Sequence, residues 1–125
     1  MKDVSCLSEN VIKQLLKVHL ISEGWRTEMY RKTHHGLDVI ALRGEEQWVI
    51  IIKGEESADC VESFISALGS IVHVMEDPNS KYSIALPDTI PFRRLWERLP
   101  LLTKQRTGIT ALFVNQTGSV VEVSG

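Results

Sequence analysis

The run WVIIIK at residues 48–53 constrains the fold of this chain more than any other stretch. Four β-branched residues follow a tryptophan without a polar interruption, which is typical of a strand that is buried on both faces. Such a strand lies inside a sheet that other elements cover from both sides. The chain is therefore expected to be an α/β layered protein with this strand at the centre of its sheet.

Hydrophobic periodicity and turn residues place the other elements around this strand. Helices are predicted at residues 8–23, with Ser8 as N-cap, at residues 58–76, from about Pro91, and as a further turn at residues 101–106. Strands are predicted at residues 25–30, 37–42, 82–86, 109–114 and 119–123. The order α-β-β-β-α-β-α-β-β contains no repeat or linker, so residues 1–125 are expected to form one domain, a mixed sheet flanked by helices.

The second long helix is expected to bury one continuous apolar stripe. Its apolar residues recur at helical spacing: Val61, Phe64, Ile65, Leu68, Ile71, Val72 and Met75.

Composition restricts the class of protein. Hydrophobic residues make up 43% of the chain and charged residues 24%, as in soluble globular domains. No apolar run approaches the ~20 residues of a membrane span, and the first residues lack the apolar core of a secretory signal, so a cytoplasmic protein without membrane contact is expected. Cys6 and Cys60 lie far apart and are expected to be reduced thiols.

Charge is distributed unevenly although the net charge is only −2. The charged residues in 45–62 are mostly acidic, whereas the charged residues in 93–106 and 26–35 are mostly basic. Most charged faces are simply solvated, but a basic face can also bind phosphates. The candidate nucleic-acid contacts are Arg31, Lys32, His34, Arg94 and Arg98.

A candidate active site follows from the two strands at residues 37–42 and 48–53. Because a short loop joins these strands, Asp38 near the start of the first is expected beside Lys53 at the end of the second. Metal-dependent cleavage of a phosphodiester uses carboxylates to hold Mg²⁺ and a lysine to stabilise the developing charge. Glu9, at the start of the first helix, is placed to add a further acid.

The element order, the early glutamate and the stretches GLDVIAL and WVIIIKGE resemble the PD-(D/E)XK nuclease superfamily, over roughly residues 9–86. The resemblance implies a restriction-endonuclease-like fold. It also implies that Asp38 is the first metal-binding acid, Lys53 the catalytic lysine and Glu9 the auxiliary acid, with Mg²⁺ as cofactor if the site is active.

The chain departs from the superfamily pattern at two positions. Ile51 stands two residues before the lysine, where a second metal-binding acid is expected, and Ser70 stands where related chains carry a glutamine. Some members of the superfamily take the second acid from elsewhere. Here the candidates for a relocated acid are Glu55, Asp59 and Glu62.

Three interpretations of function follow. The first is a nuclease-fold protein with an impaired site and no bound metal, which binds nucleic acid, DNA rather than RNA, or serves as a partner in DNA processing. The second is an active Mg²⁺-dependent endonuclease that uses Asp38 with Glu55 or Glu62 as metal ligands. The third is a protein-interaction or oligomer-forming domain, a homodimer for example, without a role on nucleic acid.

Overall fold

A computed structural model describes residues 7–31, 37–55 and 59–125 of the chain, with the backbone alone for residues 29–31 and 37–38. The elements follow the predicted order. They are α1 (Glu9–Ser22), β1 (Arg26–Arg31), β2 (Leu37–Arg43), β3 (Glu46–Ile52), α2 (Cys60–His73), β4 (Lys81–Pro87), α3 (Ile90–Arg98), α4 (Leu101–Thr107), β5 (Thr110–Val114) and β6 (Val120–Val123).

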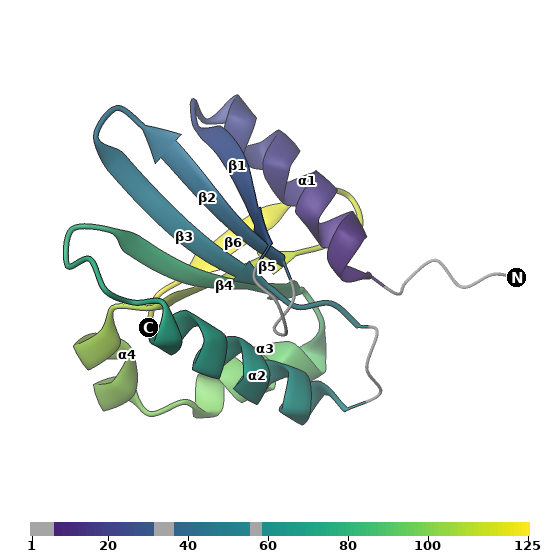
Figure 1. Cartoon of the computed structure of the whole chain (residues 1–125). Coiled ribbons are helices and arrows are strands. Elements are labelled where there is room, and N and C mark those ends of the chain that lie inside the picture. Colours follow the sequence, from purple (N-terminus) through teal and green to yellow (C-terminus); the bar gives the residue numbers. More distant parts are fainter. Residues whose placement is uncertain (1–6, 32–36, 56–58) are drawn as a thin grey trace, which may run out of the picture.

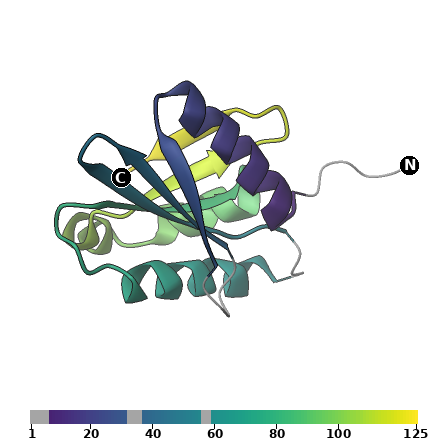
Figure 2. The same cartoon turned by 45° about the horizontal axis from the view of Figure 1, so that its top comes forward.

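The six strands form one mixed sheet in the order β1-β2-β3-β4-β5-β6. β3, β4 and β5 run parallel, and the remaining neighbours pair antiparallel. Helix α1 covers one face of the sheet, and α2 with α3 covers the other (Figures 1 and 2). The predicted mixed sheet flanked by helices is thus confirmed.

Strand β3 supplies both hydrophobic cores, as its sequence predicts. Trp48, Ile50 and Ile52 pack under α1, whereas Val49 and Ile51 pack on the side of α2 and α3. Because successive side chains of a strand point to opposite faces, an unbroken apolar run is needed to fill both layers.

Local signals account for the ends of several elements. The Ser8 hydroxyl accepts a hydrogen bond from the backbone N–H of Val11 and caps α1, as predicted. Gly24 follows that helix with φ of 92°, and Gly44 turns the hairpin between β2 and β3 with φ of 62°. A positive φ favours glycine at both positions.

The prediction that the second helix buries one continuous apolar stripe is wrong in part. Helix α2 is shorter than predicted, and it buries Phe64, Ala67 and Ile71 together with two serines. Val61, Ile65 and Val72 are 51%, 59% and 53% exposed. A helix offers the sheet only one face, and the seven predicted apolar positions cover more of the circumference than that face.

Two further observations bear on the class of protein. No helix in the described part of the chain is long and apolar enough to cross a membrane. Cys60 is a free, half-buried cysteine, and Cys6 lies outside the described residues.

Candidate active site and basic face

Lys53 is the first residue after β3, whereas the sequence predicted it as the last residue of that strand. Its backbone N–H donates to the carbonyl oxygen of Ala85 at 3.0 Å, so it continues the alignment of β3 with β4. The Lys53 ammonium nitrogen lies 4.0 Å from Glu9 Oε2, at the first residue of α1. The two side chains are only 14% and 24% exposed. The structure therefore brings together two of the three residues that were expected to form the site.

Asp38 lies at the same end of the sheet. It is the direct cross-strand partner of Ile51, so its Cα is opposite a position two residues before Lys53. The side chain of Asp38 lies outside the described part of the structure. Contact between its carboxylate and Lys53 therefore stays a prediction.

Ile51 occupies the position of the expected second acid, and its side chain is only 1% exposed. It belongs to the hydrophobic core that also contains Phe64 and Ile71 of α2 and Ile84 of β4. The position is therefore filled by an apolar side chain in a packed core. A metal ion finds neither charge nor polar ligand there.

Glu55 is joined to the residues that lead into α1. Its Oε1 atom accepts a hydrogen bond from the backbone N–H of Leu7 at 2.8 Å, and its own N–H donates to the Leu7 carbonyl at 2.8 Å. Because Leu7 precedes Glu9 by two residues, these contacts place Glu55 near the Glu9–Lys53 pair. Glu55 is therefore the candidate for a relocated acid that these hydrogen bonds connect to this region.

The other two candidates lie at the start of α2. The Asp59 carboxylate accepts hydrogen bonds from the backbone N–H groups of Val61 and Glu62, so it is the N-cap of the helix. Glu62 is exposed in the first turn. Acidic residues at these positions stabilise a helix without any role in catalysis.

The described side chains do not form a magnesium site by themselves. No group of three His, Cys, Asp or Glu residues among them is arranged to hold a metal ion. A Mg²⁺ site made of Asp38 with Glu55 or Glu62 needs the Asp38 carboxylate and stays a prediction.

Ser70, at the position of the expected glutamine, is buried in α2. Its hydroxyl has no hydrogen-bond partner among the described residues. A serine side chain is shorter than a glutamine side chain and cannot reach as far from the helix. The second departure from the superfamily pattern therefore also lies at a buried position.

The basic run at residues 93–106 divides into buried and exposed members. Arg93 makes a bidentate pair with Asp88, at 2.7 and 3.1 Å. Its guanidinium also lies 4.4 Å from the ring centre of Phe113. The Asp88 hydrogen bonds raise the already high pKa of Arg93, so this residue stays positively charged.

Lys104 is buried, with its ammonium nitrogen 4.8 Å from the ring centre of Trp96, whereas Arg93 is half-buried. Arg94 and Arg98 are exposed, one turn apart on α3, and Arg106 is exposed on α4. We refer to these three arginines as the basic face. Of the other predicted contacts, Lys32, His34 and the side chain of Arg31 lie outside the described residues.

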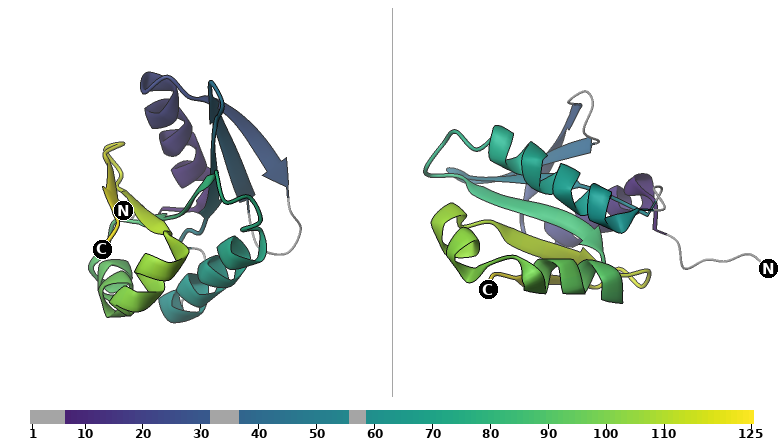
Figure 3. Two further views of the ribbon diagram at one scale, coloured as in Figure 1. Left: turned by 90° about the vertical axis from the view of Figure 1, so that its left-hand side faces the viewer. Right: turned by 90° about the horizontal axis from the view of Figure 1, so that it is seen from below.

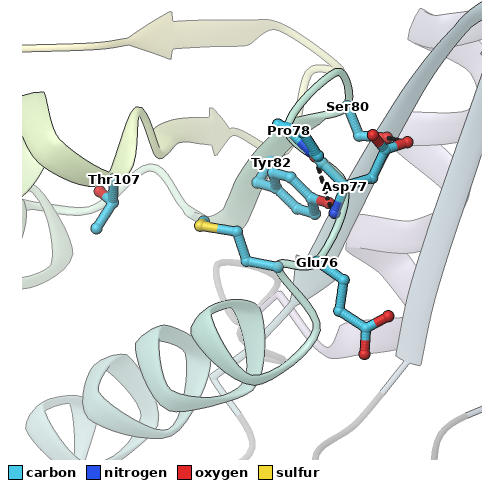
Figure 4. Close-up of a pocket in the computed structure, with 7 residues that line it drawn as sticks. Glu76, Asp77, Pro78, Ser80, Tyr82 and Thr107 are labelled. Carbon is cyan, nitrogen blue, oxygen red and sulfur yellow. Dashed lines mark hydrogen bonds between the residues drawn. The ribbon is translucent and has the colours of Figure 1, made fainter.

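A surface hollow of about 400 Å³ lies at the other end of the sheet (Figure 4). It borders the start of β4, where Lys81 pairs with Trp48, whereas Lys53 follows the end of β3. The Tyr82 hydroxyl in this hollow donates to the backbone carbonyl of Asp77 and accepts from its N–H, at 3.0 and 2.9 Å. These bonds hold the turn before β4. Because the hollow lies at the opposite end of the sheet from Lys53, it is not part of the candidate active site.

Comparison with known proteins gave no match to a family model and no match among curated proteins. The solved structures that are similar to this chain include two that match it over nearly its whole length. One is an XisH family protein from Nostoc punctiforme, with 15% identity and a TM-score of 0.65, covering 91% of this chain and 98% of the other. The second is an fdxN element excision controlling factor protein from Anabaena variabilis, with 14% identity and a TM-score of 0.66, covering 93% and 99%.

These likenesses decide the fold. The chain has a restriction-endonuclease-like fold. At 14% and 15% identity the likeness does not extend to function, because one fold hosts many activities.

Two features of the site were not found from the sequence. The contacts between Leu7 and Glu55 join residues that are 48 positions apart, and no local pattern marks them. The Asp88–Arg93 pair spans the start of α3, where an acid just before a helix was a usable signal for a partner of the first arginine.

Proposed function

We propose that this protein is a PD-(D/E)XK-type protein that has lost ordinary nuclease catalysis and binds DNA as an accessory factor in DNA processing. The observation that carries the proposal is the burial of Ile51. Where a catalytic member of the superfamily needs a metal-binding acid, this chain has an apolar side chain that is 1% exposed in a packed core.

The Glu9–Lys53 pair fits a site that has kept its structure after losing its chemistry. A mostly buried ammonium needs a nearby carboxylate, since an unpaired buried charge costs several kcal/mol, on the order of 3 to 5. Glu9 meets that need at 4.0 Å without a metal ion. The presence of the pair in this chain therefore requires no catalytic role.

DNA is the favoured partner for two reasons. Arg94 and Arg98 present two exposed guanidinium groups at one-turn spacing, which suits neighbouring phosphates of a nucleic-acid backbone. One of the similar structures is named as a controlling factor for the excision of an element. That name belongs to the other protein and suggests the process to test.

A titration of fluorescently labelled duplex DNA with the protein tests the proposal. We expect saturable binding in about 50 mM salt, a linear fall of log affinity with log salt concentration, and no stronger binding in Mg²⁺ than in EDTA. Absence of binding at low salt, up to the highest soluble protein concentration, contradicts a DNA-binding role.

An active endonuclease is the second candidate, because Glu55 is joined to the segment before α1 and lies two residues beyond Lys53. Its carboxylate already accepts a hydrogen bond from Leu7, but a carboxylate has further lone pairs for a metal ion. In this alternative Asp38 and Glu55 hold Mg²⁺, and Lys53 stabilises the developing charge on the phosphate.

A further inference from the structure

We propose that the outer flank of α2 pairs with the same helix of a second copy of this chain, in antiparallel orientation. The flank consists of Val61, Ile65, Leu68 and Val72, of which three are more than half exposed. Exposed apolar residues that gather on one helix face mark an interaction surface. This inference is independent of the proposed function.

The spacing along the flank is that of a coiled-coil seam. The intervals between the four residues are four, three and four positions, as for alternating d and a positions of the heptad repeat. Val61 and Leu68 take the d positions, and Ile65 and Val72 take the a positions. Phe64 and Ile71, which α2 buries under the sheet, lie to one side of the seam, and half-buried Leu68 at the edge of the seam also packs against that core.

The seam is complementary to itself. Because the intervals read the same from either end, an antiparallel copy places Val61 against Val72 of the partner and Ile65 against Leu68 of the partner. Each facing pair then joins an a position with a d position. A two-fold interface must match one patch with itself in this way.

Charge favours the antiparallel orientation over the parallel one. Glu62 lies in the first turn of α2, and His73 in the last turn. Antiparallel pairing keeps the two Glu62 residues apart and places the two helix dipoles in opposite directions, although Glu76 and Asp77 follow His73 at the far end. A parallel pair sets Glu62 beside Glu62 and aligns the two helix dipoles unfavourably.

The flank is accessible in the described structure. Seen from below the sheet, α3 runs along one side of α2, and no helix of the described residues lies along the other side (Figure 3). Helix α1 also exposes apolar residues, namely Val11, Val18 and Ile21. The intervals of the α2 seam, counted from Val11, fall on Leu15, Val18 and Ser22, so that set ends in a serine and leaves Ile21 outside it. Helix α1 therefore serves as the control.

Sedimentation equilibrium over about 1 to 500 μM protein tests the pairing. The seam is short, so we expect a concentration-dependent dimer in the range of transient interfaces. Ile65→Glu is expected to give a monomer throughout, because a carboxylate then faces the partner seam. Ile21→Glu on α1 is the matched control, since Ile21 and Ile65 are both 59% exposed isoleucines in helices, and it is expected to dimerise as the wild type does.

Two results overturn the inference. One is a wild-type protein that stays monomeric at every concentration, and the other is an equal loss of dimer in Ile65→Glu and Ile21→Glu. Circular dichroism checks that both variants are folded. We expect both to be folded, because both substitutions are at exposed positions.

The register has its own test, in protein with Cys6→Ser and Cys60→Ser. Oxidation of an equal mixture of Ile65→Cys and Leu68→Cys proteins is expected to give mainly the mixed disulfide dimer. Val61→Cys mixed with Leu68→Cys is the control, because four residues of offset, about 6 Å along the helix, carry the Cα atoms beyond disulfide reach. Equal yields from both mixtures contradict the antiparallel register.

Discussion

Replacing Ile51 by glutamate is expected to lower the free energy of unfolding by about 3 to 5 kcal/mol at pH 8, as for an unpaired charge in a core. The isoleucine is 1% exposed between β3 and α2, so the new carboxylate has neither water nor a described polar partner in that core. The variant restores an acidic residue at the motif position two residues before Lys53, but we expect it to destabilise the fold and not to rebuild a metal site. Urea denaturation at two pH values measures the effect.

The pH dependence of this variant has a definite sign. Burial raises the pKa of the new carboxyl group above its unfolded value of about 4.3. Below that value the group is protonated in both states and adds no charge penalty. As pH rises through the range between the unfolded and folded pKa values, the variant loses stability relative to the wild type.

Two controls isolate the charge at position 51. Ile51→Val removes one methylene group and is expected to cost about 0.5 to 1.5 kcal/mol without this pH dependence. Val121→Glu adds a carboxylate at a 41% exposed position of β6 and is expected to change stability little. If about 10 mM Mg²⁺ stabilises the Ile51→Glu protein but not the wild type, position 51 faces a metal site and our account of Ile51 is wrong.

Removing two charges from the basic face is expected to weaken duplex DNA binding about 10- to 100-fold in 50 mM salt. Arg94→Ala combined with Arg98→Ala removes two exposed guanidinium groups from α3 while leaving the Asp88–Arg93 pair in place. The slope of log affinity against log salt is expected to become shallower by about 2, one for each lost phosphate contact.

Lys13→Ala combined with Lys17→Ala is the matched control for this experiment. These lysines are also one helical turn apart, but they lie on α1, across the sheet from α3. Both double variants lose two positive charges, so net charge alone affects them equally. An equal loss of affinity in the two variants contradicts a specific role of the basic face.

The sequence predicted the elements that depend on local pattern or on an unbroken apolar run. The burial of β3 on both faces and the Ser8 cap of α1 are confirmed, because each depends on residues within one element. The structure also places the Lys53 ammonium nitrogen 4.0 Å from Glu9 Oε2. The sequence placed Glu9 within reach of the cluster from its position at the start of the first helix, and the catalytic roles that the resemblance implies for both residues stay predictions.

What could not be predicted depends on packing between distant elements. The apolar residues of α2 were assigned to one buried stripe, yet the face that meets the sheet holds Phe64 and Ile71 and leaves Ile65 exposed. The sequence pattern shows that a helix is apolar but not how far its partner wraps around it. In the same way, the exposed or buried state of Arg94 and Lys104 depends on where α3 and α4 pack.

The most direct test of the central claim is a cleavage assay with supercoiled plasmid DNA in Mg²⁺ and in Mn²⁺. We predict that the wild-type protein produces no more nicked or linear product than the Lys53→Ala protein, under conditions in which the wild type binds the DNA. Cleavage by the wild type that Lys53→Ala abolishes would contradict the account. If Glu55→Gln abolished that cleavage too, Glu55 would be identified as the relocated acid.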